Sequence, residues 1–83
     1  MKLHVLKIER SYYIEVMGLN KKAELRINDR NFKLGDIVHF TDTDGEEYEG
    51  TFSLFKITHI LEVSEVTNLP TAYVMLSIEP VEL

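Results

Sequence analysis

Short stretches of alternating apolar and polar residues, separated by turn residues, constrain the fold of this chain most strongly. The alternation is cleanest between Lys22 and Asn28, where every second residue is apolar. A period of two is typical of a β-strand, because successive side chains of a strand point to opposite faces. One face of this strand carries Ala23, Leu25 and Ile27, and the other carries Lys22, Glu24, Arg26 and Asn28. We therefore expect a strand that displays a charged polar face.

Four further segments have strand character. The first is Leu3 to Ile8, and the second, which follows Gly35-Asp36, contains Val38 and Phe40. The third lies between Phe52 and Val63. The fourth contains Val74, Leu76 and Ile78 and ends at Pro80. Between Phe52 and Val63 the apolar residues change from even to odd positions, which predicts a β-bulge. The Asp44-Gly45 dipeptide favours a tight hairpin turn between the two middle segments.

A short helix is expected between the first two strands. Ser11 is a favourable N-cap, and Gly18 supplies a stop. Between them, Tyr12 and Val16 recur at helical spacing, so the predicted helix covers Tyr12 to Met17. Because this helix covers a barrel, we expect at least one of Tyr12 and Tyr13 to lie in the core.

Turn-forming residues from Asn28 to Asn31 follow the second strand. After this turn, Phe32 and Leu34 are expected to fold back into the core. Five short strands and one helix in 83 residues predict a single domain, residues 1–83. Its expected fold class is mostly β: a small, mostly antiparallel β-barrel of five to six strands with one or two short helices.

The charge of the chain is uneven along its length. The net charge of −5 argues against a protein that coats nucleic acid through many phosphate contacts. The first 33 residues carry eight basic and four acidic residues, whereas the remaining fifty carry one basic and ten acidic residues. Such a chain can offer one local basic surface to an anion, so any contact with nucleic acid should be small and site-specific. The same charges would equally serve to solvate two surfaces.

The chain contains no cysteine, which excludes disulfides, zinc-thiolate sites and thiol nucleophiles. A secreted domain of this size usually needs such staples, so we expect a cytoplasmic protein. The longest apolar stretches are only a few residues long, and His4 and Lys7 interrupt the first one. Neither a membrane span nor a signal peptide is therefore expected.

No metal or cofactor site is expected. The acidic loop from Asp42 to Glu49 lacks carboxylates at the first and last positions of an EF-hand. His4, His39 and His59 fall on three different predicted strands without a pairwise ligand spacing, and His59 shares the phase of apolar neighbours, which predicts a core histidine. Neither a G-x-S-x-G nucleophile motif nor a glycine-rich phosphate loop occurs.

The segment from Gly18 to Asp36 carries the strongest candidate site. Glu24 and Arg26 lie two residues apart on one side of a strand, and Lys21 precedes them. A carboxylate accepts hydrogen bonds from base N–H groups, while lysine and arginine donate to carbonyl or phosphate oxygens. Together the three could read the edge of a small polar ligand, or they could form a plain surface salt bridge.

This segment resembles the ASCH domain, a branch of the PUA-like barrels. The pattern of that family is approximately G-x-K-x-x-E-x-R, and its counterparts here are Gly18, Lys21, Glu24 and Arg26, followed by Asn28-Asp29-Arg30, Phe32 and Gly35-Asp36. The chain is most similar to short bacterial and phage ASCH-like proteins of uncharacterised function, which begin with an H-x-L-K strand, here His4, Leu6 and Lys7, and end with a Tyr-Val strand, here Tyr73-Val74. Two residues separate Gly18 from Lys21, one more than in the common pattern, so either Lys21 or Lys22 enters the site.

The resemblance implies a pseudo-barrel with a cleft between the barrel and its helix, which binds RNA or a modified nucleoside or nucleotide. Lys21, Glu24 and Arg26 would line this cleft. Arg30 or Lys33 would hold backbone phosphates, and His4 is a further candidate contact. This leading hypothesis is a binding module rather than an enzyme.

Two alternatives stay open. Some ASCH-like proteins are similar to small amidohydrolases that act on acylated nucleosides with a lysine and a threonine three residues later. Here the lysine is Lys21, but Glu24 stands in the threonine position, and a carboxylate is not that nucleophile. Lys21 and Glu24 are nevertheless the candidate catalytic residues if the chain is an enzyme. The second alternative is an adaptor that binds a protein partner through an exposed sheet edge.

Overall fold

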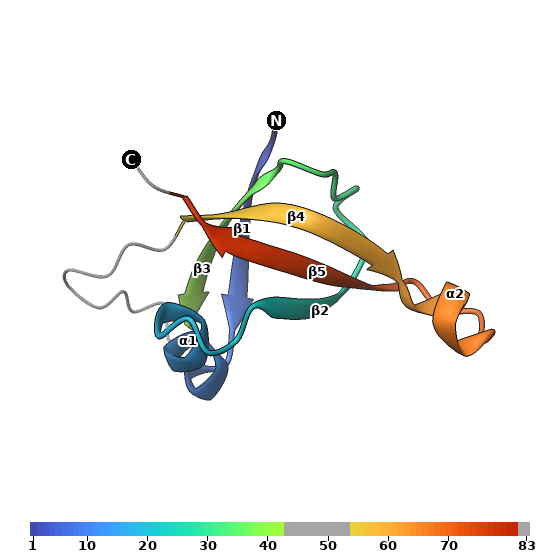
Figure 1. Cartoon of the computed structure of the whole chain (residues 1–83), viewed down its shortest axis with the longest axis horizontal. Helices are drawn as coiled ribbons and strands as arrows, with labels where there is room; N and C mark the ends of the chain where they lie inside the picture. The colour runs from blue at the N-terminus through green and yellow to red at the C-terminus, as the bar shows by residue number, and fades with distance from the viewer. Residues whose placement is uncertain (43–53, 82–83) are drawn as a thin grey trace.

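The computed structural model describes residues 1–42 and 54–81 of the chain. Its elements are β1 (Leu3–Ile8), α1 (Arg10–Met17), β2 (Ala23–Ile27), β3 (Ile37–Asp42), β4 (Leu54–Glu62), α2 (Val63–Thr67) and β5 (Tyr73–Pro80). The strands form one curled sheet in the order β1-β3-β4-β5-β2, with α1 at one end and α2 beyond the far ends of β4 and β5 (Figure 1). The predicted fold class, a small barrel-like β fold with short helices, is confirmed.

The curl of the sheet depends on β4. The first residues of β4 pair antiparallel with β3, and its whole length pairs antiparallel with β5. A register shift between Ile57 and His59 confirms the predicted bulge. It lies just after Lys56, the last residue of β4 that pairs with β3. Bulges increase the local twist of a strand, so β4 can serve both halves of the sheet. The bulge also explains why the prediction for His59 was wrong: this side chain is exposed, not in the core.

The two outermost strands, β1 and β2, are the edges of the sheet. β1 pairs with β3 in the parallel direction, whereas β2 pairs antiparallel with β5. The parallel pair is possible because the chain between β1 and β3 contains α1 and β2 and is long enough to cross over. Within residues 1–42 and 54–81, neither edge strand has a second strand beside it.

The core fills the inside of the curl. Every strand except β2 contributes buried apolar side chains: Leu6, Ile8, Val38, Phe40, Phe55, Ile57, Val74, Leu76 and Ile78. Tyr13 and Val16 of α1 and Phe32 of the β2–β3 loop complete this cluster. Burial of each large apolar side chain stabilises the fold by roughly 1.5 to 3 kcal/mol. Tyr13 is buried and Tyr12 is exposed, which confirms the expectation that at least one of them lies in the core.

Some local expectations are corrected. α1 begins at Arg10, and its N-cap is Glu9 without a capping hydrogen bond from the side chain, so Ser11 lies inside the helix. Leu34 is exposed, because only Phe32 of the β2–β3 loop turns into the core. α2 directly follows β4 and is the second of the one or two short helices expected. The predicted Asp44-Gly45 turn lies outside the described residues.

The orientation of β2 is the main surprise of the fold. Its polar face turns inward, where Glu24 is only 8% exposed, while Leu25 and Ile27 are each 48% exposed on the outside. An inward polar face is stable only when its charged groups find partners. The partners of Glu24 define the site described below. Among the described residues, none of the helices has the length and apolar character to cross a membrane.

Candidate functional site

A cavity of about 420 Å³ lies between the edge strands β1 and β2. Its charged lining residues are Lys7, Glu9, Glu24, Arg26, Asp29 and Arg30. Leu6, Ile8 and Phe32 add apolar surface from the core, and Tyr12 and Tyr73 add aromatic rings. The cavity therefore combines apolar surface with a few convergent polar groups, as small-molecule sites do.

Two arginine side chains bridge the opening between β1 and β2. Arg26 on β2 donates from Nη2 to the carbonyl oxygen of Lys7 at 2.6 Å. Arg30, in the loop after β2, donates from Nη1 to the carbonyl oxygen of Val5 at 3.0 Å. One edge of β1 faces no other strand of the described sheet. The two guanidinium groups donate to carbonyl oxygens on that edge, so these backbone acceptors are satisfied.

Lys21, Glu24 and Arg26 come together in one ion-pair cluster at the wall of this cavity. The Nζ atom of Lys21 lies 2.9 Å from Oε2 of Glu24, and Nε of Arg26 lies 3.6 Å from Oε1 of the same carboxylate. Lys21 also donates to the carbonyl oxygen of Ala23. The side chains of Lys21 and Arg26 are about a quarter exposed, at 26% and 24%. Lys21, not Lys22, is the lysine that contacts Glu24, but neither lysine lines the cavity itself.

Two tyrosines line the cavity toward opposite ends of β2. Tyr12 of α1 lies near the start of β2, where the Nζ atom of Lys21 is 5.9 Å from its ring centroid. Tyr73 pairs with Ile27 at the other end of β2. The sequence gave no reason to place Tyr73, Glu9 or Asp29 at the site. The signal that could have found Tyr73 is the strand pairing that places it beside Ile27.

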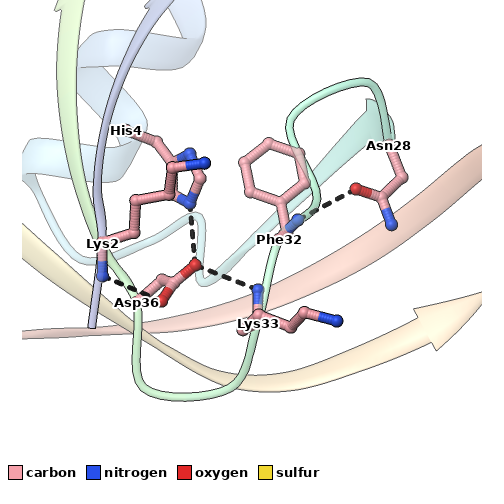
Figure 2. Close-up of polar contacts among 6 residues, drawn as sticks. All are labelled: Lys2, His4, Asn28, Phe32, Lys33 and Asp36. Carbon is pink, nitrogen blue, oxygen red and sulfur yellow. Dashed lines mark hydrogen bonds and ion pairs between the residues drawn. The ribbon is translucent and has the colours of Figure 1, made fainter.

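His4 does not line the cavity. Its ring lies inside the fold, with Nε2 donating to Oδ2 of Asp36 at 2.8 Å and with the ring of Phe32 at 4.7 Å between centroids (Figure 2). The reason is the alternation of β1, in which His4, Leu6 and Ile8 all point inward. His4 is therefore part of the packing beneath the β2–β3 loop.

Lys33 is also away from the ion-pair cluster. Its backbone N–H donates to Oδ2 of Asp36 at 3.1 Å (Figure 2). Lys33 also borders a different hollow, which residues of β4 and α2 line as well. Of the six candidate binding residues, Glu24, Arg26 and Arg30 line the cavity and Lys21 joins them through Glu24, whereas His4 and Lys33 surround Asp36.

Asp36 is the acceptor that ties the β2–β3 loop to β1. Its Oδ1 accepts from the backbone N–H of Lys2 at 3.1 Å, and its Oδ2 accepts from His4 and from Lys33. Burial by itself raises the pKa of the Asp36 carboxyl, but these hydrogen bonds outweigh it, so the pKa lies below its ordinary value. The carboxylate consequently holds the loop that carries Arg30 in place.

The comparison with known families identifies this chain. Residues 3–78 match the family described as a domain of unknown function, DUF3850, and the chain belongs to that family. A search of curated proteins finds no match. The matched residues include every residue that lines the cavity.

Proposed function

We propose that this member of the DUF3850 family is a binding module for RNA or a modified nucleotide, and that its cavity between β1 and β2 takes a single base. The observation that carries this proposal is the buried carboxylate of Glu24, held by Lys21 and Arg26 at the wall of that cavity. A volume of about 420 Å³ falls within the range of small-molecule sites. The resemblance of the same segment to ASCH domains supports the same ligand class.

Each group around the cavity has a chemical role in this proposal. Glu24 accepts hydrogen bonds from base N–H groups, because an ionised carboxylate only accepts. Arg26 uses one Nη2 hydrogen on Lys7, and its guanidinium has further N–H donors for carbonyl or phosphate oxygens. The exposed rings of Tyr12 and Tyr73 offer stacking surfaces, which contribute about 1 to 3 kcal/mol per base in other proteins.

The charges favour one base over a long nucleic acid. Around the cavity, the cations Lys7, Arg26 and Arg30 are matched by the anions Glu9, Glu24 and Asp29. The whole chain carries −5, so an extended polyanion would be repelled away from this site. We therefore place most of the binding free energy in the base rather than in the phosphates.

Amide hydrolysis is the weaker alternative. The Lys21 ammonium is engaged by the Glu24 carboxylate and by the Ala23 carbonyl oxygen, and no threonine stands three residues after it. We expect no acetate release when the protein is incubated with N4-acetylcytidine. Turnover in that assay would contradict the proposed binding module and would show that the protein is a hydrolase.

The test is a calorimetric titration of the wild-type protein and the Arg26→Ala variant with the four ribonucleosides, N4-acetylcytidine and a short single-stranded RNA. Loss of a hydrogen bond from a charged donor costs about 1.5 to 3 kcal/mol, so binding should weaken roughly 10- to 100-fold. Lys56→Ala is the matched control, because it removes a cation paired with Glu79 outside the cavity. The proposal fails if none of these ligands binds, or if Arg26→Ala binds as tightly as the control.

A further inference from the structure

The free edge of β2 presents backbone groups to the cavity. On its other edge, β2 pairs with β5, where the N–H of Asn28 donates to Ala72 and the N–H of Ile78 donates to the carbonyl of Lys22. In an antiparallel pair, the backbone N–H and C=O groups of every second residue bond to the partner strand. The backbone groups of the residues in between point away from that strand. The even-numbered residues of β2 therefore bond to β5, and the backbone groups of Leu25 and Ile27 point toward β1. Both residues line the cavity although their side chains lie on the outer face.

Some of the odd-numbered groups already have partners. The carbonyl of Ala23 accepts from Lys21, and the carbonyl of Ile27 accepts from the N–H of Asp29 at 2.9 Å. Between these two carbonyls lie the N–H of Leu25, the C=O of Leu25 and the N–H of Ile27. No strand of the described residues lies on that side of β2. Along the strand these groups read donor, acceptor, donor.

We propose that this edge reads an imide, a ring N–H flanked by two carbonyl groups, so that the cavity selects a uracil-type base. An imide reads acceptor, donor, acceptor, which complements the three groups of Leu25 and Ile27. Backbone groups that no described strand pairs gain most from a ligand that pairs all of them. The inference rests on the proposed function and adds to it the identity of the base and the residues that select it. Because a uracil-type nucleoside has a single base N–H, which the carbonyl of Leu25 accepts, Glu24 then holds Lys21 and Arg26 in place instead of accepting from the base.

A small ligand suits this opening better than an added β-strand. A strand inserted between the two edges would need the carbonyl groups of Val5 and Lys7 on β1, which accept from Arg30 and Arg26. It would also need the carbonyl of Ile27, which accepts from Asp29. The acceptors that a continuous ladder requires are thus taken at three positions, whereas the donor-acceptor-donor set of an imide reader is complete.

The first test compares three nucleosides on the wild-type protein by calorimetric titration: uridine, N3-methyluridine and cytidine. Methylation removes the central donor, and cytidine replaces the imide by an acceptor and an amino group. We expect uridine to bind at least 10-fold more tightly than either. Equal binding of N3-methyluridine, or tighter binding of cytidine, overturns the imide reading and leaves the proposed function standing. Absence of binding by every nucleoside and by RNA overturns both.

The second test removes the backbone donor of Leu25. Leu25→Pro deletes an N–H that makes no ladder bond, and proline is tolerated on such positions of edge strands. Leu25→Ala is the matched control, because it loses the same outer side chain but keeps the N–H. We expect Leu25→Pro to bind uridine at least 10-fold more weakly than Leu25→Ala, which keeps the backbone N–H. Equal affinity of the two variants, with Leu25→Pro folded by circular dichroism, contradicts the proposal; the nucleoside comparison decides it if Leu25→Pro does not fold.

Discussion

Two buried carboxylates of this small barrel have opposite surroundings. Asp36 is 3% exposed and accepts from a buried histidine ring and from two backbone N–H groups. Glu24 is 8% exposed, but its partners Lys21 and Arg26 are long side chains that are about a quarter exposed and lie at a cavity. The comparison teaches that burial of an acidic group does not by itself mark a site. What differs is whether its partners are enclosed or can reach a ligand.

The difference has a structural origin in the neighbouring strands. Asp36 precedes β3, in the middle of the sheet, where β1 and the β2–β3 loop close over it. Glu24 stands on an edge strand, next to the side of β2 that no strand in the described part of the chain covers. Asp36 therefore stabilises the fold, whereas Glu24 is available for recognition.

The largest effect is expected from Asp36→Ala. The substitution leaves the His4 ring N–H and the backbone N–H groups of Lys2 and Lys33 without their acceptor. Removal of one partner of a buried pair costs about 3 kcal/mol or more, so we expect a loss of that size in the free energy of unfolding. Urea denaturation measures it. A loss below about 1 kcal/mol would show that Asp36 does not hold the loop.

The pH dependence of stability tests the same carboxylate with a smaller effect. The pKa of Asp36 is lowered in the fold, so its contribution is complete above the unfolded value of about 4 and is lost as the pH falls through the lower folded value. The stability difference between the wild type and Asp36→Asn should be constant above about pH 5 and should shrink below about pH 4. Denaturation curves at several pH values measure it, and a difference that grows in acid would contradict it.

The smallest effect on stability is expected from Glu24→Gln. Glutamine keeps the shape and one acceptor oxygen, and the partners Lys21 and Arg26 are partly solvated, so the cost should be about 1 kcal/mol. Nucleoside binding should nevertheless weaken at least 10-fold, because the carboxylate that holds Lys21 and Arg26 at the cavity wall loses its charge. A loss of stability equal to that of Asp36→Ala, with binding unchanged, would reverse the comparison between the two carboxylates.

Much of the secondary structure could be predicted because it depends on local pattern. The first strand was predicted with its observed bounds, and the phase change in the long strand correctly indicated the bulge. Phe32 was correctly placed in the core, but Leu34 was not, because both have the same pattern and only tertiary packing decides which one the loop turns inward. The prediction that His59 lies in the core was wrong for a similar reason, because a bulge changes which residues face the core.

The sequence predicted several of the charged residues that form the candidate site, but not how the sheet arranges them. The spacing of Glu24 and Arg26 put both on one face of a strand, and the structure brings Lys21 to the same carboxylate. Alternation alone does not say which face of an edge strand turns inward, because that depends on the curl of the whole sheet. The roles of Arg26 and Arg30 as bridges to β1 and the free edge at Leu25 follow from long-range strand order, which no local pattern records.

The most direct test of the account is a titration of the ¹⁵N-labelled protein with uridine, followed through its backbone amide resonances. We predict saturable shifts for the amides of Lys7, Leu25 and Ile27, around the cavity, while those of Lys2 and Lys33, which donate to Asp36, stay in place. Shifts centred on Lys2 and Lys33, or a spectrum that uridine leaves unchanged, would contradict the claim that the open carboxylate and not the enclosed one marks the site.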